Sequence, residues 1–106
     1  WQVMRFAWTG DFDHPATLAD IFRSTSPQNL PGFASERYDQ LLAEAEATVD
    51  PEQQMRLYAT AEAVLLEAAP IAPLYFYVSK HLVQPDISGF VSNVFDRHPS
   101  RYFKKQ

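Results

Sequence analysis

The sequence predicts an α/β chain in which a helical hairpin packs with short strands. Two amphipathic stretches, 35–48 and 51–68, each start at or directly after a helix-capping residue and lie almost directly one after the other. Aromatic and β-branched runs at 3–8 and 74–78 favour strands. The chain has 106 residues, of which 46% are hydrophobic and 21% are charged, so it can bury a modest core and disorder is not expected.

The first predicted elements are a strand, a sharp turn and a helix. The strand covers 3–8, and Thr9 and Gly10 interrupt it, because glycine adopts backbone angles that a side chain forbids. Pro15 can occupy the first turn of a helix that continues over 16–22.

Asp11 lies in this turn between two aromatic residues, Trp8 and Phe12. A carboxylate held there offers an anion to a ligand cation beside a flat apolar wall. The alternative is that Asp11 or Asp13 caps the following helix. The residues alone favour that alternative, since aspartate often precedes a helix.

The loop 23–33 contains turn residues at nearly every position and is long for a plain connection. Long loops often carry function, which makes Asn29 and Phe33 candidates for contact with a ligand. Simple exposure to solvent is the stronger expectation for both.

Both helices of the hairpin have clear start signals. Ser35 is a good N-cap, and Asp50, Pro51 and Gln53 form a capping-box pattern with proline at the first helical position. The positions expected to be buried are Tyr38, Leu41, Leu42, Ala45 and Val49 in the first helix, and Met55, Leu57, Tyr58, Ala61, Ala63, Val64, Leu65 and Leu66 in the second.

Prolines end the second helix, and 74–78 is the strongest strand candidate in the chain. Side chains alternate along a strand, so Tyr75 and Tyr77 share one face and offer a stacking surface with hydroxyl tips. The alternative is that both tyrosines pack beneath a helix. The stretches 91–95 and 101–103 are weaker strand candidates.

Composition excludes several function classes. The net charge of −4 and the pI near 5.2 argue against nucleic-acid binding, and the lack of cysteine excludes disulfides and thiol chemistry. His14, His81 and His98 lack metal-ligand spacing, so each is predicted to be a surface or capping histidine. We expect no metal, no cofactor and no catalytic residue, and no apolar stretch approaches the ~20 residues that span a bilayer.

Short motifs follow one another along nearly the whole chain, and their order and spacing are more specific than any one of them. In this order they resemble the carboxy-terminal part of the periplasmic oligopeptide-binding proteins, the extracellular solute-binding family 5 components of ABC peptide importers. The motifs are Trp8-Thr9-Gly10-Asp11-Phe12 with Asp13 and Pro15, Tyr38-Asp39-Gln40-Leu41, Leu57-Tyr58-Ala59-Thr60-Ala61-Glu62, Pro73-Leu74-Tyr75-Phe76-Tyr77-Val78, Val83-Gln84-Pro85 and Ser88-Gly89.

The resemblance implies a two-lobed, type II periplasmic-binding-protein fold that closes on its ligand. Residues 1–78 would be a segment of the C-terminal, ligand-binding lobe, and 79–106 a segment that returns to the N-terminal lobe. Family members are several hundred residues long, so the chain looks like a fragment. We therefore expect exposed strand edges that are open to self-association.

The resemblance also implies the site residues. Asp11 matches the carboxylate that pairs with the peptide's α-amino group, and Trp8 matches an indole that lines a side-chain pocket. Phe12 stands where the family often has tyrosine, which removes one hydroxyl.

The backbone at Ala7 and Thr9 would pair with an extended peptide as an added strand. Tyr77 matches a tyrosine whose hydroxyl reaches the ligand backbone.

The function that follows is peptide binding between two lobes for an ABC-type importer, with oligopeptides or dipeptides as ligands and no enzymatic activity. The implied partners are membrane permease subunits, and the implied location is the periplasm or a lipid anchor on the outer face of the cytoplasmic membrane. The alternative is a structural or protein-interaction domain built on the helical hairpin. A hydrolase that uses Asp11 and Asp13 is disfavoured, because no supporting histidine or metal cluster is evident.

Overall fold

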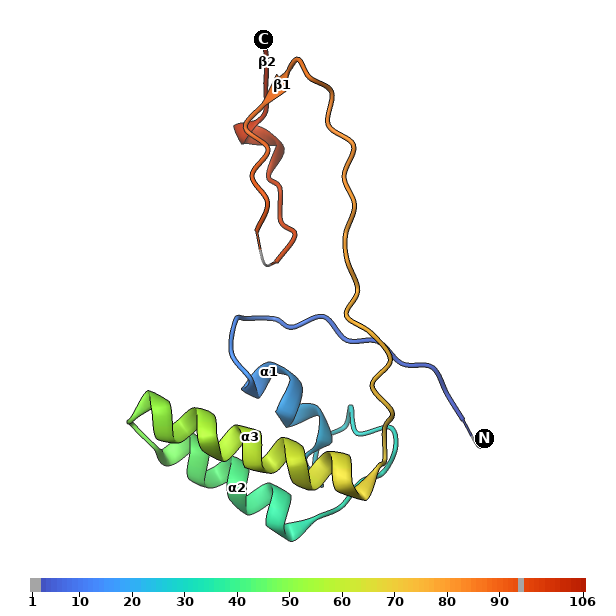
Figure 1. Cartoon of the computed structure of the whole chain (residues 1–106), viewed down its shortest axis with the longest axis vertical. Helices are drawn as coiled ribbons and strands as arrows, with labels where there is room; N and C mark the ends of the chain where they lie inside the picture. The colour runs from blue at the N-terminus through green and yellow to red at the C-terminus, as the bar shows by residue number, and fades with distance from the viewer. Residues whose placement is uncertain (1–2, 94) are drawn as a thin grey trace. The chain divides into compact units, whose positions relative to one another are not determined.

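The computed structural model describes residues 3–93 and 95–106, and the chain divides into two compact units, one ending at Pro73 and one starting at Leu74. Figure 1 shows a helical first unit and a second unit with little regular structure. The first unit contains α1 (Ala16–Ala19), the 3-10 helix η1 (Asp20–Phe22), α2 (Glu36–Ala47) and α3 (Pro51–Ala68), and the second contains β1 (Ile87–Ser88), the 3-10 helix η2 (Ser100–Tyr102) and β2 (Lys104–Lys105).

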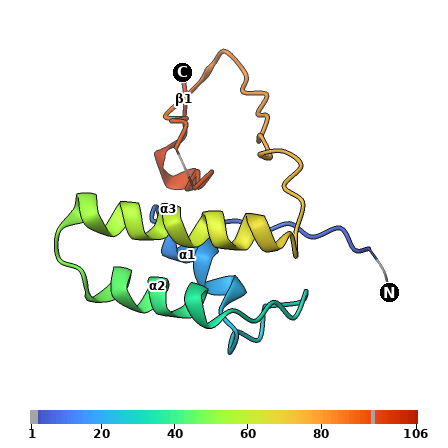
Figure 2. The same ribbon diagram turned by 60° about the horizontal axis from the view of Figure 1, so that its bottom comes forward.

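The helical hairpin is confirmed: α2 and α3 lie side by side with opposite directions (Figures 1 and 2). Ser35 caps α2, because its Oγ accepts a hydrogen bond of 3.2 Å from the backbone N–H of Tyr38. Asp50 caps α3, where a carboxylate oxygen accepts a 3.1 Å bond from the N–H of Gln53. Within the described residues, no helix is both long and apolar enough to cross a membrane.

The core of the first unit lies where α1, η1 and the following loop meet the facing stripes of α2 and α3. Three of its side chains are almost fully enclosed, namely Tyr38, Leu41 and Leu42. The complete set of buried hydrophobic residues is Ile21, Phe22, Phe33, Tyr38, Leu41, Leu42, Ala45, Tyr58, Ala61 and Leu65.

Four predicted core positions are wrong. Val49 is 95% exposed, because α2 ends at Ala47 and Val49 lies in the linker beyond the buried stripe. Met55, Ala63 and Leu66 are exposed on α3. The helix is apolar on more than one side, but α1 and α2 pack against only part of its surface.

The loop 23–33 is held by Asn29 and Phe33, neither of which is a free surface residue. The Asn29 side chain accepts a 3.0 Å bond from the N–H of Phe33 and donates to the carbonyl oxygens of Phe33 and Arg23. Phe33 is buried and meets the Tyr38 ring edge-on, with 5.4 Å between the ring centroids. Both residues therefore brace the loop, and the expectation of solvent exposure is wrong for Phe33.

The predicted strands are not formed. The described parts of 3–8, 74–78 and 91–95 have no strand, position 94 lies outside the described residues, and 101–103 falls largely in η2. Among the described residues the sheet is a single antiparallel pair, with Ile87 opposite Lys105 and Ser88 opposite Lys104. A strand needs a hydrogen-bonded neighbour, and local β propensity cannot supply one.

Candidate functional site

The turn between residues 9 and 15 is fixed on α1 by its backbone. The N–H of Asp11 donates a 2.8 Å hydrogen bond to Oγ1 of Thr17. Gly10 permits this approach, since a Cβ added there would lie 3.0 Å from Cγ2 of Thr17. The expected special backbone angle at Gly10 is wrong, because among the described glycines only Gly32 and Gly89 have positive φ. Gly10 is needed for space.

His14 connects the same turn to α3. Its Nδ1 accepts a 3.2 Å bond from the N–H of Ala16, so the imidazole acts as the cap of α1. Its Nε2 lies 3.1 Å from Oε1 of Gln54, and the ring meets Tyr58 edge-on at 5.3 Å between centroids. These contacts require a neutral ring with the proton on Nε2. The prediction of a capping histidine is confirmed for His14.

Asp11 and Asp13 do not cap α1. Its N-cap position is Pro15, which forms no side-chain cap bond, and both aspartates are exposed. The alternative role of Asp11 as a helix cap is therefore wrong. Within the described part of the chain, its carboxylate forms no hydrogen bond or ion pair and is available to a ligand.

Exposed aromatic residues stand on both sides of Asp11 in the sequence. Trp8 is 41% exposed and stacks on Phe6 with 6.1 Å between the ring centroids. Phe12 is 51% exposed and lies 6.4 Å from the His14 ring. The turn thus combines an accessible anion with two accessible aromatic faces.

The backbone before the turn is open. Ala7 and Thr9 are exposed, and neither forms a backbone hydrogen bond with another described residue. Such a segment keeps its N–H and C=O groups available to a partner strand.

Tyr77 is part of the second unit and is 84% exposed, so the alternative that it packs beneath a helix is wrong. Tyr75 is also exposed, at 64%. The role of Tyr77 in ligand contact remains a prediction.

The second unit contains a group of side chains that sequence spacing did not reveal. His81 and His98 both contact the carboxylate of Asp96, at 2.5 and 2.8 Å. The separation of 15 positions between His81 and Asp96 hides this proximity, and the Asp-x-His pair at 96–98 is its only local signal.

The chain is similar to segments of several peptide-binding proteins, although no family model matches it. It is 35% identical over 92 residues to the periplasmic murein peptide-binding protein MppA of Escherichia coli, which is 87% of this chain and 17% of MppA. It is 33% identical to the periplasmic oligopeptide-binding protein OppA of Haemophilus influenzae over 85% of this chain and 17% of OppA. It is 32% identical to the dipeptide-binding protein DppE of Bacillus subtilis over 95% of this chain and 18% of DppE.

The fold of this chain also matches part of a solved structure. The structure of the murein tripeptide binding protein MppA of Escherichia coli matches 92% of this chain with a TM-score of 0.84 and 33% sequence identity, and the match covers 19% of that structure. The chain thus spans less than one fifth of the length of the relatives that it matches.

Proposed function

We propose that this chain, a homologue of a segment of the periplasmic peptide-binding proteins, forms one wall of a peptide-binding site. The relatives are binding proteins for murein peptides, oligopeptides and dipeptides, which favours this function over a protein-interaction domain. The fold agrees with that of MppA, a type II periplasmic binding protein. The activity proposed here is binding and release of intact peptide, without catalysis.

The observation that carries the proposal is the placement of Asp11. Its backbone is tied to Thr17, and the same turn is tied to α3 through His14 and Gln54. The backbone that carries the carboxylate is therefore anchored, and the carboxylate remains exposed. A peptide's α-amino group is a cation that is costly to desolvate without a partner, so a positioned carboxylate selects a free amino terminus.

The segment beside Asp11 supplies the rest of the wall. The open backbone at Ala7 and Thr9 would hydrogen-bond an extended peptide as an added strand. Main-chain bonding gives affinity that does not depend on the peptide's side chains. Trp8 and Phe12 would face the first side chains of the peptide. The exposed hydroxyl of Tyr77 is proposed separately as a donor to the ligand backbone.

The proposal extends to the whole protein. Residues 1–78 would belong to the C-terminal lobe of the whole protein and 79–106 to the return toward its N-terminal lobe. The peptide would be enclosed between the two lobes of the whole protein. The closed protein would deliver peptide to the membrane permease subunits of an ABC importer. This role would require the protein to lie in the periplasm or on a lipid anchor at the outer face of the cytoplasmic membrane.

Calorimetric titration of the whole protein with di-, tri- and tetrapeptides tests the proposal. We expect saturable binding at one site, with similar affinity for peptides that differ in side chains, and recovery of intact peptide by chromatography afterwards. A protein-interaction domain would give no heat with any peptide. Absence of binding across the panel, or cleavage of the bound peptide, would overturn the proposal.

A further inference from the structure

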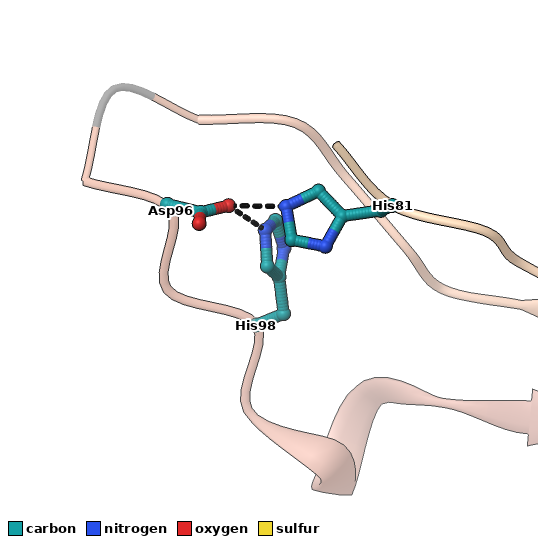
Figure 3. A group of neighbouring side chains, drawn as sticks. All are labelled: His81, Asp96 and His98. Carbon is teal, nitrogen blue, oxygen red and sulfur yellow. Dashed lines mark hydrogen bonds and ion pairs between the residues drawn. The ribbon is translucent and has the colours of Figure 1, made fainter. Parts of the chain in front are cut away.

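His81, Asp96 and His98 form a compact group in the second unit (Figure 3). Nε2 of each histidine points at the same carboxylate oxygen, Oδ1 of Asp96, at 2.5 Å from His81 and 2.8 Å from His98. One potential ligand atom from each residue lies within 4.8 Å of the others. Two imidazole nitrogens thus converge on one carboxylate oxygen.

The turn that carries Asp96 and His98 is braced by Asn93. The Asn93 side chain donates 2.9 Å to the carbonyl oxygen of Arg97 and accepts a 3.2 Å bond from the Arg97 N–H. The N–H of Asp96 also donates to the carbonyl oxygen of Asn93, at 3.1 Å. Asp96 has φ of 53°, a left-handed conformation that aspartate tolerates better than most residues.

Phe90 orients both imidazoles. The His98 ring stacks on it with 4.3 Å between centroids, and the His81 ring lies 5.1 Å from it. The two histidine rings meet edge-on at 4.8 Å. Packing of the rings restricts the side-chain rotamers of both histidines and keeps their nitrogens near the carboxylate. A metal site requires ligands that are oriented in this way before the ion binds.

The group is accessible from solvent. The side chains of His81 and Asp96 are 36% and 41% exposed, and that of His98 is 12% exposed. Both histidines also line a hollow of about 480 Å³ next to Val83 and Phe103. An ion and its remaining water ligands could enter from this side.

We propose that His81, Asp96 and His98 bind a divalent first-row transition-metal ion, represented by Zn²⁺, through the two Nε2 atoms and one carboxylate oxygen. Imidazole nitrogens favour such ions over Mg²⁺ and Ca²⁺, which prefer oxygen ligands. Three protein ligands leave room for water at the fourth position. The site is independent of the peptide-binding function proposed above.

The three side chains must rearrange to hold the ion, because Oδ1 is too close to each Nε2 and the ligand atoms of the group are spread over up to 4.8 Å. Tetrahedral ligands at the usual 2.0–2.1 Å from Zn²⁺ lie about 3.3 Å from one another. Oδ1 must therefore move away from each Nε2 by roughly half an ångström or slightly more, starting from 2.5 and 2.8 Å. The Nε2 proton that bonds to Oδ1 without metal must leave, and in a neutral ring it moves through water to Nδ1.

The test is calorimetric titration of the whole protein, freed of metal with a chelator, with ZnCl₂ and separately with MgCl₂. We expect one saturable Zn²⁺ site that is lost or weakened in His81→Gln, His98→Gln and Asp96→Asn. The loss should be at least about 10–100-fold in affinity, the range known for removing even an outer-shell partner of a metal ligand. Mg²⁺ should not bind at this site.

Asp86→Asn is the matched control, because Asp86 is another acid of the second unit and pairs only distantly with Lys105, at 3.8 Å. It should leave Zn²⁺ affinity unchanged. Equal Zn²⁺ binding by the three ligand variants and the unmodified protein would overturn the proposal.

A second measurement needs no substitution. In ¹⁵N spectra of the unmodified protein, Zn²⁺ should shift Nε2 of His81 and His98 to metal-bound values and move the ring proton to Nδ1. A purely structural hydrogen-bonded group would keep its Nε2 protons in Zn²⁺, and that result would refute the site even if a variant failed to fold.

Discussion

The hydroxyl of Tyr38 donates a 2.7 Å hydrogen bond to the carbonyl oxygen of Ala19. This bond joins α2 to the end of α1, the short helix whose Thr17 holds the backbone of Asp11. Tyr38 is only 1% exposed, and the bond itself is partly buried. The helical hairpin thereby supports the turn that carries the candidate site.

Replacing Tyr38 with phenylalanine should destabilise the protein by about 1–3 kcal/mol, because the partly buried Ala19 carbonyl loses its side-chain donor. Tyr58→Phe is the matched control, since Tyr58 is 5% exposed but its hydroxyl bonds to no described residue. Urea unfolding measures both. Equal losses in the two variants would show that the Tyr38 bond contributes no special stability.

Alkaline pH should unfold the protein partly through the same residue. Burial, assisted by the nearby Asp20 carboxylate, raises the pKa of Tyr38 above its ordinary value near 10. The folded state therefore favours the neutral phenol, so this stabilisation is complete below pH 10 and is lost as pH rises above it. Unfolding free energy measured from pH 9 to 12 should fall less steeply in Tyr38→Phe than in the unmodified protein.

Two adjacent leucines test the buried stripe of α3. Leu65 is 6% exposed in the core, whereas Leu66 is 43% exposed. Leu65→Ala should cost about 2–5 kcal/mol, because it leaves a cavity, and Leu66→Ala should cost much less. The midpoints of denaturant unfolding curves compare the stability of the two variants, provided that the curves have the same slope. A larger loss in Leu66→Ala than in Leu65→Ala would show that the buried stripe of α3 is misplaced.

Gly89 is required for close approach of the chain beside the two-stranded sheet. Its φ is 91°, and an added Cβ would lie 1.8 Å from the carbonyl oxygen of Tyr102. Gly89→Ala should speed amide exchange in β1 and β2, because the Tyr102 backbone must move away.

Gly32→Ala separates this clash from backbone strain, since Gly32 also has positive φ, at 70°, but open space around it. Gly32→Ala should lower the free energy of unfolding only by the roughly 1–2 kcal/mol that a left-handed alanine costs, and it should leave amide exchange in β1 and β2 unchanged. An unaltered exchange rate in Gly89→Ala would contradict the predicted clash.

Asp11→Asn in the whole protein tests the proposed contact with the peptide's amino terminus. The variant should lose about 2–5 kcal/mol of binding to free peptide, much of it the penalty for an unpaired cation. N-acetylated peptide, which lacks that charge, should bind the unmodified protein poorly and the variant about equally poorly. Asp13→Asn is the control and should keep the preference for free peptide. Calorimetry that finds the same free-to-acetylated affinity ratio in Asp11→Asn and the unmodified protein would assign the amino terminus to another partner.

Local sequence signals determined the helices and the positioned turn. Ser35 and Asp50 start their helices because a side-chain oxygen within three residues satisfies a free backbone N–H, which is a local event. The ordered motifs also identified the peptide-binding relatives. The peptide contacts of Asp11 and Tyr77 remain predictions.

Only the tertiary structure decided which apolar residues are buried and which polar side chains contact one another. Leu65 and Leu66 have the same side chain, and packing of α3 on α2 buries one of them. The runs at 3–8 and 74–78 have strand composition but form no strand, because a strand depends on a neighbour that local sequence does not supply. His81 and His98 meet at Asp96 only through the fold of the second unit, since contacts across 15 residues depend on chain path and not on spacing.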